Sequence, residues 1–330
     1  MKVGVFSCKS YDREFFNNRN HNYGYELEFL DCALTPETAL LTKPFDAISV
    51  FVDDIVNREV LDTLKESGIH HIALRCSGFN NIDLEYAKEI GIGVSRVPRY
   101  SPESVAEHTI ALILALDRRL FKAYSRVVDN NFELEGLLGF NLANKKIGVI
   151  GTGAIGQALI KILLGFGCRV LCNDINPSDQ IKSLGCDYVS LQDLIKNADV
   201  ITLHCPLTAE SQHLIDHEAV QNMKDGVMLI NTSRGGLVNT KALLAGLKSN
   251  KIGYLGIDMY EMESELLNHD LLCEKVDDDI YQRLATFPNV LITGHQGFFT
   301  RESMIQVTDT TLSNLQYFFA GKICAETFLN

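Results

Sequence analysis

The sequence has 330 residues, which is enough for two domains, because single hydrophobic cores stop growing near ~250–300 residues. Its formal net charge of −12 disfavours nucleic acid and anionic membranes as partners, but a small anionic substrate needs only a local cationic site. The nine cysteines show neither CxxC pairs nor the spacing of a disulfide framework. No stretch approaches the ~20 apolar residues that span a bilayer, and the N-terminus is unlike a signal peptide. These features predict a cytoplasmic protein with reduced thiols.

Residues 2–97 contain short β-rich runs, each followed by a polar or helical stretch. Five strands that alternate with helices predict a parallel, doubly wound sheet. This segment has no glycine fingerprint of its own, so we expect a second domain whose ligand edge is the carboxyl ends of its strands. The predicted strands are Val3–Ser7, Leu27–Leu30, Ile48–Val52, Ile72–Arg75 and Gly93–Val97.

A long helix is predicted to begin near Ser101 and Pro102, because proline and an acidic residue favour a first helical turn. Its apolar residues recur at helical spacing, and Arg118 and Arg119 suit its end. Residues 121–145 follow as an apolar arm with weak periodicity. The arm either contacts a partner subunit or packs as a loop, and we favour the subunit contact because the arm has no core of its own.

The most informative pattern lies at residues 147–174, which predict a strand, a glycine turn, a helix and a second strand. Gly151-Thr152-Gly153-Ala154-Ile155-Gly156 is a GxGxxG sequence between an apolar strand and a helix, the context that the dinucleotide fingerprint requires. Gly151 permits the tight turn, Gly153 leaves room for a pyrophosphate, and Gly156 lets helix and strand approach closely. The N–H groups of the first helical turn then face the phosphates.

Asp174 is predicted at the end of the second strand of this unit, about 20 residues beyond the glycines. A carboxylate at that place can accept a hydrogen bond from a ribose 2′-hydroxyl, whereas its charge would repel a 2′-phosphate. The sequence therefore predicts NAD rather than NADP.

Four more strands and a C-terminal helix are predicted after this unit. With the first two, these strands make the six of a full dinucleotide-binding fold. The acidic segment 261–279 is predicted to be mostly a solvated face, and the helix Arg301–Phe319 is expected to pack on the first domain. The four strands are Val200–Leu203, Val227–Asn231, Tyr254–Asp258 and Val290–Thr293.

Polar groups follow several of these strands, at the edge where ligands bind in an open α/β sheet. Hydride transfer between a nicotinamide and a carbonyl needs a general acid and a cation beside the carbonyl. His295 is the best acid because imidazole titrates near neutral pH, and Arg234 is the best anchor because its planar fork matches a carboxylate. The groups are Arg75 to Gly78, His204-Cys205-Pro206, Thr232-Ser233-Arg234, Asp258 and His295.

Each of these residues also has a purely structural interpretation. Arg234 could form a surface ion pair, His295 could be a hydrogen-bonded turn residue, and Asp258 could cap a turn. Joint placement at the strand ends of a dinucleotide fold favours the functional interpretation of Arg234 and His295. No metal site is predicted, because His213 and His217 are four residues apart but nothing matches HExxH.

Seven segments give the chain a resemblance to the D-isomer-specific 2-hydroxyacid dehydrogenase family over essentially its whole length. Within the family, RCSGFNNID, MYEMESELL and GHQGFF are most similar to the fermentative NAD-dependent D-lactate dehydrogenases. The resemblance predicts an NAD-binding Rossmann domain, residues 101–297, inserted into a flavodoxin-like substrate domain, residues 1–100 and 298–330. The segments are RCSGFNNIDL (75–84), VPRYSPESVAEHT (97–109), GVIGTGAIG (148–156), HCPLT (204–208), INTSRGGLV (230–238), GIDMYEME (256–263) and TGHQGFF (293–299).

The resemblance implies a role for each matching position. His295 would be the acid/base, and Arg234 would bind the carboxylate and the carbonyl of the substrate. Glu263 would hydrogen-bond His295 and keep it protonated, since a neighbouring carboxylate raises the pKa of an imidazole. For cofactor binding, the resemblance implies Gly151, Gly153, Ala154, Ile155, Gly156, Asp174, Cys205, Pro206, Thr232, Ser233 and Asp258.

For the substrate, the resemblance implies backbone N–H groups of Ser77 and Gly78 and the hydroxyl of Tyr100. Phe51 and Phe298 would form the walls of the pocket around the methyl group. Phe51 stands where other lactate enzymes carry tyrosine, and a large ring there should favour pyruvate over branched 2-oxo acids.

The predicted activity is the reversible, NADH-dependent reduction of pyruvate to D-lactate. The partner is a small 2-oxo or 2-hydroxy acid, with neither nucleic acid nor membrane, and the assembly is a homodimer or homotetramer. The enzyme alternative is a reductase of hydroxypyruvate, glyoxylate, phenylpyruvate or 2-oxoisocaproate. The alternative from another class is an NAD-sensing protein similar to the transcriptional corepressors that resemble this family.

Overall fold

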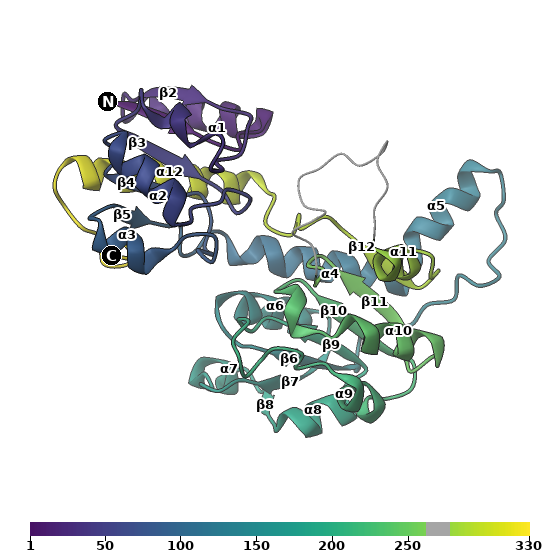
Figure 1. Ribbon diagram of the computed structural model, residues 1–330. Coiled ribbons are helices and arrows are strands. Elements are labelled where there is room, and N and C mark those ends of the chain that lie inside the picture. Colours follow the sequence, from purple (N-terminus) through teal and green to yellow (C-terminus); the bar gives the residue numbers. More distant parts are fainter. Residues whose placement is uncertain (262–277) are drawn as a thin grey trace. The chain divides into compact units, whose positions relative to one another are not determined.

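The computed structural model describes residues 1–261 and 278–330, which divide into two compact units (Figure 1). Unit 1 comprises Met1–Ser101 and Phe299–Asn330, and unit 2 comprises Pro102–Phe298. Each unit contains one parallel sheet with helices packed on it, so the predicted fold class is confirmed. Among the described helices, none is long and apolar enough to cross a membrane.

The sheet of unit 1 has the strand order β2-β1-β3-β4-β5, and every neighbouring pair is parallel. This is the flavodoxin-like order, in which ligands bind where the order reverses. All five predicted strands are present. Each ends one or two residues before the predicted end, because the turns begin sooner, and four of them begin one residue earlier than predicted. The strands are β1 Lys2–Val5, β2 Glu26–Phe29, β3 Ala47–Val50, β4 His71–Leu74 and β5 Gly93–Ser95.

Successive residues of these strands point to opposite faces of the sheet, so two apolar clusters form. Ala47 and Ala73 lie with Phe16 and Leu312 in the cluster beneath α1 and α12. Ile48 and its neighbours lie in the larger cluster beneath α2 and α3. The helices of unit 1 are α1 Ser10–Asn20, the 3-10 helix η1 Ala39–Thr42, α2 Arg58–Glu66, α3 Leu84–Glu89 and α12 Arg301–Phe319.

Helix α12 returns from the far end of the sequence to unit 1, as predicted. It packs on α1 and on β4, with Leu312 and Leu315 fully buried. Asp309 of α12 accepts two hydrogen bonds of 2.7 Å from the guanidinium of Arg19 at the end of α1. Thr300 caps the start of the helix by accepting from the Ser303 N–H. Unit 1 is therefore completed by its C-terminal segment.

The sheet of unit 2 has the order β12-β11-β10-β9-β6-β7-β8, again with all pairs parallel. The order reverses between β6 and β9, as in a doubly wound dinucleotide-binding sheet. The sequence predicted six of these strands and missed β8, because two residues give no periodicity. The strands are β6 Lys146–Ile150, β7 Arg169–Asn173, β8 Asp187–Tyr188, β9 Val200–Leu203, β10 Val227–Asn231, β11 Ile252–Ile257 and β12 Val290–Ile292.

Helices cover both faces of this sheet. Val149 and Ile230 face a cluster under α4 and α6, whereas Ile150 and Leu229 face a cluster under α8, α9, α10 and α11. The strands are therefore apolar on both sides, as buried parallel strands are. The helices are α4 Pro102–Asp117, α5 Leu120–Val128, α6 Ala154–Gly165, α7 Asp179–Ser183, α8 Leu191–Asn197, α9 His217–Asn222, η2 Gly235–Leu237, α10 Thr240–Lys248 and α11 Asp279–Ala285.

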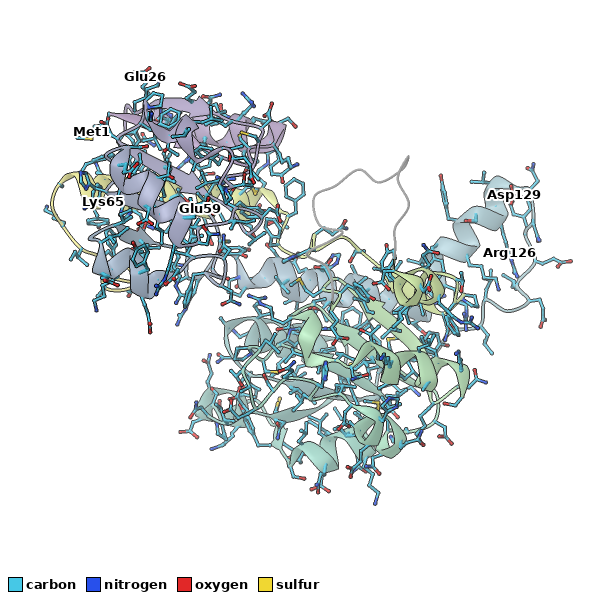
Figure 2. All side chains as sticks on the ribbon, in the orientation of Figure 1. Met1, Glu26, Glu59, Lys65, Arg126 and Asp129 are labelled. Atoms are coloured by element: carbon cyan, nitrogen blue, oxygen red, sulfur yellow. The ribbon has the colours of Figure 1, made fainter. Side chains whose placement is uncertain are left out.

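The arm after α4 differs from the prediction, because it contains the helix α5 where the weak periodicity predicted none. Arg119 has a left-handed backbone (φ 48°), which ends α4 and starts a separate helix. Figure 2 labels Arg126 and Asp129 at the far end of α5. The Arg126 guanidinium donates to the carbonyls of Glu133 and Glu135 and so ties the rest of the arm to the helix.

Candidate active site

The carboxyl ends of the strands in unit 2 carry the residues that the sequence singled out. Gly151 follows β6, Asp174 follows β7, and Cys205 comes two residues after β9. Arg234, Asp258 and His295 come one to three residues after β10, β11 and β12. Because all seven strands are parallel, these residues share one edge of the sheet.

The glycine turn after β6 has the geometry of a phosphate-binding loop. Gly151 has φ +93°, and a Cβ there would lie 2.5 Å from the Cys205 nitrogen, so only glycine fits. A Cβ at Gly156 would overlap the carbonyl oxygen of Gly151. A Cβ at Gly153, by contrast, would meet no atom within 4 Å, which leaves space for a ligand against the backbone. Helix α6 begins at Ala154 and Ile155, so its first-turn N–H groups adjoin that space.

Asp174 is hydrogen-bonded to the same loop. Its Oδ2 accepts from the Thr152 N–H at 2.5 Å and from the Thr152 hydroxyl at 3.0 Å, and its Oδ1 accepts from the Asn176 N–H at 2.8 Å. Burial alone would raise the pKa of Asp174, but these hydrogen bonds outweigh it and hold the pKa below its usual range. The residues present therefore fit an NAD ribose: the carboxylate is charged, oriented and beside the glycine turn.

The turns after β9 and β10 are joined to each other. The Ser233 hydroxyl donates to the Cys205 carbonyl at 2.8 Å, and Pro206 follows in the same turn, with its carbonyl bound to Ser211. Thr232 is buried and shares a hydrogen bond of 2.9 Å with Thr109 of α4. Cys205, Pro206, Thr232 and Ser233 thus lie in two hydrogen-bonded turns, called the rim below, and Thr232 connects this rim to α4.

Arg234 lies at the end of that rim with an exposed side chain. Asn231, a buried residue at the end of β10, fixes its backbone: the Asn231 amide donates to the Arg234 carbonyl at 2.9 Å and accepts from the Ser233 N–H at 3.1 Å. The Arg234 guanidinium donates to the Ser233 carbonyl at 2.7 Å. Among the described residues, no carboxylate lies within 4.0 Å of it. The surface ion pair that the sequence left open is not seen there.

Asp258 holds the turn that carries His295. Its carboxylate is buried and accepts from the Thr293 hydroxyl at 2.5 Å, the Gln296 N–H at 3.0 Å and the Gly297 N–H at 2.8 Å. His108 of α4 lies 3.2 Å from the same carboxylate and 3.2 Å from Thr293. Burial alone would raise the pKa of Asp258, but these contacts hold it at about 2.

His295 adopts a left-handed backbone (φ 53°), which is uncommon for a residue other than glycine. Its N–H donates to the Asp258 carbonyl at 2.9 Å, and its ring meets Phe298 edge to face, with ring centroids 6.1 Å apart. Burial lowers the pKa of His295; the charge of Asp258 raises it and that of Arg234 lowers it further. The structure therefore brings His295, Asp258, Arg234 and Phe298 together.

The predicted substrate residues of unit 1 follow β3, β4 and β5. Phe51 is fixed through its N–H, which donates to Asp54 at 2.6 Å, and its carbonyl, which accepts from Asn81 at 2.9 Å. Ser77 and Gly78 lie in the turn after β4, and Tyr100 lies in the segment after β5. The structure thus places all four at the carboxyl edge of the unit 1 sheet.

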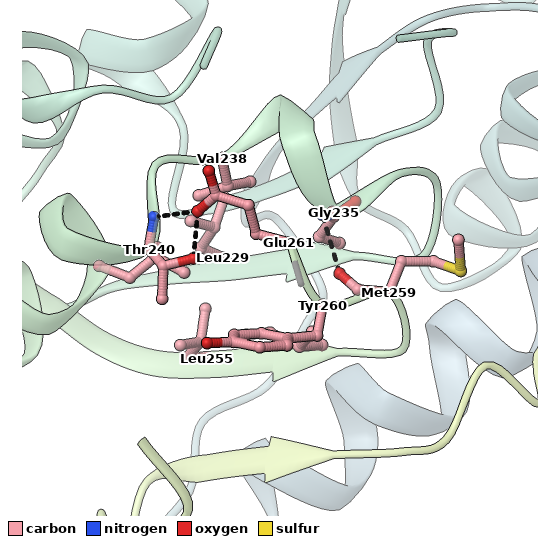
Figure 3. A pocket seen from close by; sticks show the side chains of 11 residues that line it. Leu229, Gly235, Val238, Thr240, Leu255, Met259, Tyr260 and Glu261 are labelled. Atoms are coloured by element: carbon pink, nitrogen blue, oxygen red, sulfur yellow. Dashed lines mark hydrogen bonds between the residues drawn. The ribbon is translucent and has the colours of Figure 1, made fainter. Parts of the chain in front are cut away.

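Glu263 lies outside the described residues, so the structure gives no account of its predicted contact with His295. Glu261 is described, and its carboxylate accepts from the Thr240 N–H and hydroxyl (Figure 3). The same carboxylate lies 2.6 Å from His213. These contacts border an apolar cavity of about 10 Å³, which is room for about one water and not for a substrate. His213, considered above as a metal ligand, is therefore engaged by Glu261.

Sequence reasoning missed two residues that stabilise the site through contacts with its backbone or carboxylate. Asn231 and His108 were assigned only to a strand and to a helix. Strand and helix periodicity predicts which face a residue occupies but not its hydrogen-bond partner in another element. The available signal was polarity, since a histidine on an apolar helix face and an asparagine at the end of a buried strand need buried partners.

Comparison with known proteins identifies the family of this chain. Residues 110–297 match the model of the D-isomer specific 2-hydroxyacid dehydrogenase, NAD binding domain. The D-lactate dehydrogenase of Escherichia coli (strain K12) is 48% identical over 324 residues, which cover 98% of each chain. The chain belongs to the D-isomer specific 2-hydroxyacid dehydrogenase family.

Two solved structures show the same fold over nearly the whole chain. The apo-structure of the E. coli D-lactate dehydrogenase has a TM-score of 0.93 and 47% identity, and covers 100% of both chains. The D-lactate dehydrogenase of Aquifex aeolicus, complexed with NAD and lactic acid, has a TM-score of 0.86 and 37% identity, with 99% of this chain and 98% of that one covered. This member of the family is an NAD-dependent oxidoreductase, and the predicted resemblance and cofactor are confirmed.

The Asp258 carboxylate yields a prediction about stability. The Gln296 and Gly297 N–H groups donate to different oxygens of Asp258, so in Asp258→Asn the amide N–H₂ must face one of these two donors, which leaves buried groups unsatisfied. We expect the free energy of unfolding, measured by urea denaturation, to fall by about 1–3 kcal/mol, with a lower kcat because the His295 turn loosens. Asp225→Asn, which changes an exposed carboxylate of the same unit, is the matched control. Wild-type stability in Asp258→Asn would contradict the assigned role.

Proposed function

We propose that this enzyme reduces pyruvate to D-lactate with NADH. The observation that carries the proposal is the placement of Arg234 and His295 after β10 and β12, on either side of Asp258 after β11, at one edge of the NAD-binding sheet. A cation and a general acid at the carboxyl ends of strands are what a 2-oxo acid requires for reduction. The relatives named above as D-lactate dehydrogenases support pyruvate as the substrate.

Each catalytic residue has one task in this proposal. Arg234 binds the substrate carboxylate through its planar fork and polarises the 2-oxo group. The N–H groups of Ser77 and Gly78 and the Tyr100 hydroxyl also bind the carboxylate. When bound, NADH supplies a hydride to the 2-oxo carbon. His295 donates its proton to the carbonyl oxygen, so the alcohol forms and the imidazole is left neutral.

The cofactor residues are assigned on the geometry of the glycine turn. Gly151 and Gly156 shape the turn, Gly153, Ala154 and Ile155 face the pyrophosphate, and Asp174 binds the adenosine ribose. Cys205 and Pro206 lie toward the adenosine, while Thr232, Ser233 and Asp258 lie toward the nicotinamide. In domain terms, residues 101–297 bind NAD, and residues 1–100 and 298–330 form the substrate domain. Eight free thiols among the described cysteines suit a reducing cytoplasm, which is where we place the enzyme.

The size of the acid is set by two phenyl rings in this proposal. The Phe51 ring lies 5.5 Å from the Arg75 guanidinium, and the Phe51 backbone is fixed by Asp54 and Asn81. The Phe298 ring lies against His295. In the proposal, a large ring at position 51 favours a substrate with a methyl group over one with a longer side chain.

A panel of 2-oxo acids tests the proposed substrate. We expect kcat/KM with NADH to be highest for pyruvate and lower for hydroxypyruvate, glyoxylate, phenylpyruvate and 2-oxoisocaproate. The branched acid should be worse by about 10–200-fold, because each methylene that does not fit costs that much. A higher kcat/KM for another acid would assign the enzyme to that acid, and no turnover of any acid would favour the NAD-sensing alternative.

Two variants show whether the activity belongs to the described site. Arg234→Gln removes the fork that binds the carboxylate, and His295→Ala removes the proton donor. We expect each to lower kcat/KM for the best acid by at least about 10²-fold, while NADH binding, followed by its fluorescence, persists. Near wild-type turnover in either variant would contradict the mechanism.

Glu263 gives a separate prediction about pH. In the proposal its carboxylate raises the pKa of His295 and opposes the lowering that burial causes. Reduction needs the protonated imidazole, so kcat/KM for pyruvate falls as pH rises through this pKa. In Glu263→Gln that fall should move to lower pH by about one to two units. Glu265→Gln is the matched control, and an unshifted profile in Glu263→Gln would remove Glu263 from the mechanism.

We also propose that the arm of residues 121–145 is a contact between identical subunits in a homodimer or homotetramer. Its apolar side chains are unusually exposed: Tyr124, Phe132, Leu134 and Leu138 have 72–88% of their surface accessible. Leu134 and Leu138 also border a cavity of about 380 Å³ with Arg118. Exposed apolar patches of this kind mark protein interfaces.

Charge placed on the arm should dissociate the assembly. We expect Leu134→Asp and Leu138→Asp together to lower the molar mass measured by light scattering to that of smaller species, because a buried carboxylate is costly. Ile323→Asp, at an equally exposed site in unit 1, is the control. An unchanged molar mass, or a monomeric wild type, would exclude the arm as the interface.

A further inference from the structure

The turn after β4, Cys76 to Phe79, has both of its central carbonyls engaged from within unit 1. The Ser77 carbonyl accepts from Nη1 of Arg96 at 2.9 Å, and the Gly78 carbonyl accepts from the Cys76 thiol at 3.2 Å. The N–H groups of Ser77 and Gly78 donate to no other described residue. A Cβ built on Gly78 would meet no atom within 4 Å. The turn therefore points its carbonyls inward and leaves space beside Gly78.

Arg96 contacts the turn at two points. Its guanidinium lies 5.1 Å from the centre of the Phe79 ring, and its Nη1 donates to Ser77. The backbone of Arg96 is held on both sides: its N–H donates to the Thr327 carbonyl at 2.8 Å, and its carbonyl accepts from Asn314 at 3.0 Å. The side chain therefore extends from a fixed backbone.

The charge of Arg96 is not balanced by a carboxylate among the described residues. Three other arginines of unit 1 lie over aromatic rings. Arg13 pairs with Asp31 at 2.6 Å and Arg58 pairs with Asp83 at 3.1 Å, whereas Arg75 donates to backbone carbonyls. Within residues 1–261 and 278–330, no Asp or Glu lies within 4.0 Å of Arg96, and its Nε is buried without a hydrogen-bond partner. A half-buried cation without a counter-ion is costly unless an anion comes near it.

The peptide between Ser77 and Gly78 connects this cation to the proposed carboxylate site. A trans peptide is planar, so the Gly78 N–H points in the direction opposite to the Ser77 carbonyl. Arg96 binds that carbonyl and thereby fixes where the N–H points. A cation on the oxygen also polarises the peptide, which strengthens the N–H as a donor to an anion.

We propose that Arg96 is a positioning residue for the substrate carboxylate, acting through the Ser77–Gly78 peptide. This inference rests on the proposed function, in which the Gly78 N–H binds that carboxylate. Arg96 does not touch the substrate. Arg75, the other arginine near this turn, has a different role. Its buried guanidinium donates to the carbonyls of Phe6, Ser7 and Ser49, and its charge opposes the rise in pKa that burial causes at Asp54.

The test compares a charged and an uncharged ligand. Arg96→Gln keeps an N–H donor but removes the charge, and Arg96→Lys keeps the charge but removes the planar fork. For Arg96→Gln we expect KM for pyruvate and the inhibition constant of oxamate to rise roughly tenfold, with KM for NADH unchanged. The inhibition constant of pyruvamide, which has no carboxylate, should not change. Arg96→Lys should restore most of the affinity for oxamate.

Arg13→Gln is the matched control, because Arg13 also lies over a ring and donates to a backbone carbonyl, but on the edge strand β2. It should leave every constant unchanged. Equal weakening of oxamate and pyruvamide by Arg96→Gln would show a structural role only and would overturn the proposal, as would an unchanged KM. If Arg96→Gln does not fold, Arg96→Met against Arg96→Lys gives the same comparison.

The result does not depend on which 2-oxo acid is preferred. If the panel assigns the enzyme to another acid, the same variants are assayed with that acid, its amide and oxamate. A failure of pyruvate as substrate would then overturn the proposed function alone. A failure of the charge comparison would overturn the role of Arg96 alone.

Discussion

The buried Asp258 carboxylate is the interaction on which the arrangement of unit 2 depends. It collects donors from the turn after β12 and lies beside His108 of α4, while its own backbone accepts from the N–H of His295. Burying a carboxylate is costly, and this one is stable because four neighbouring groups donate hydrogen bonds to it or lie against it. Its low pKa of about 2 keeps it charged at any physiological pH. One buried charge thus sets the left-handed backbone of His295 and fixes the turn to helix α4. The acid/base group and the helix at the start of unit 2 are therefore not independent.

The second constraint is steric and lies at the point where the strand order reverses. Gly151 approaches the peptide between His204 and Cys205 so closely that no side chain fits, and Gly156 approaches Gly151 in the same way. These contacts bring the turns after β6 and β9 together. The open space is at Gly153 instead, next to the start of α6 and to Asp174. The glycines therefore differ in purpose: two allow the backbone to pack on itself, and one leaves room for the ligand.

The sequence was sufficient for the parts of this structure that periodicity and position determine. β9 and β10 have the predicted bounds, and α12 spans the predicted residues and returns to unit 1. β8 was missed because two residues carry no pattern, and α5 because none of its residues is buried. The resemblance supplied residue roles that spacing alone left open. Neither source found Asn231, His108 or Arg96, since their roles are hydrogen bonds between elements far apart in sequence. A one-dimensional pattern contains no information about such pairs.

The charges of the molecule explain how an acidic protein can bind an anion. With a net charge of −12, the long-range field repels a 2-oxo acid, so binding must rely on local cations. Arg234 and Arg96 share one feature: each donates to a backbone carbonyl, and neither has a carboxylate within 4.0 Å in the part of the chain that the structure describes. By contrast, Arg13, Arg19 and Arg58 each form an ion pair with an aspartate, which balances their charge. A carbonyl orients a guanidinium without neutralising it, so the positive potential remains available to a ligand. Replacing either carbonyl contact by a carboxylate would keep the geometry and remove the attraction.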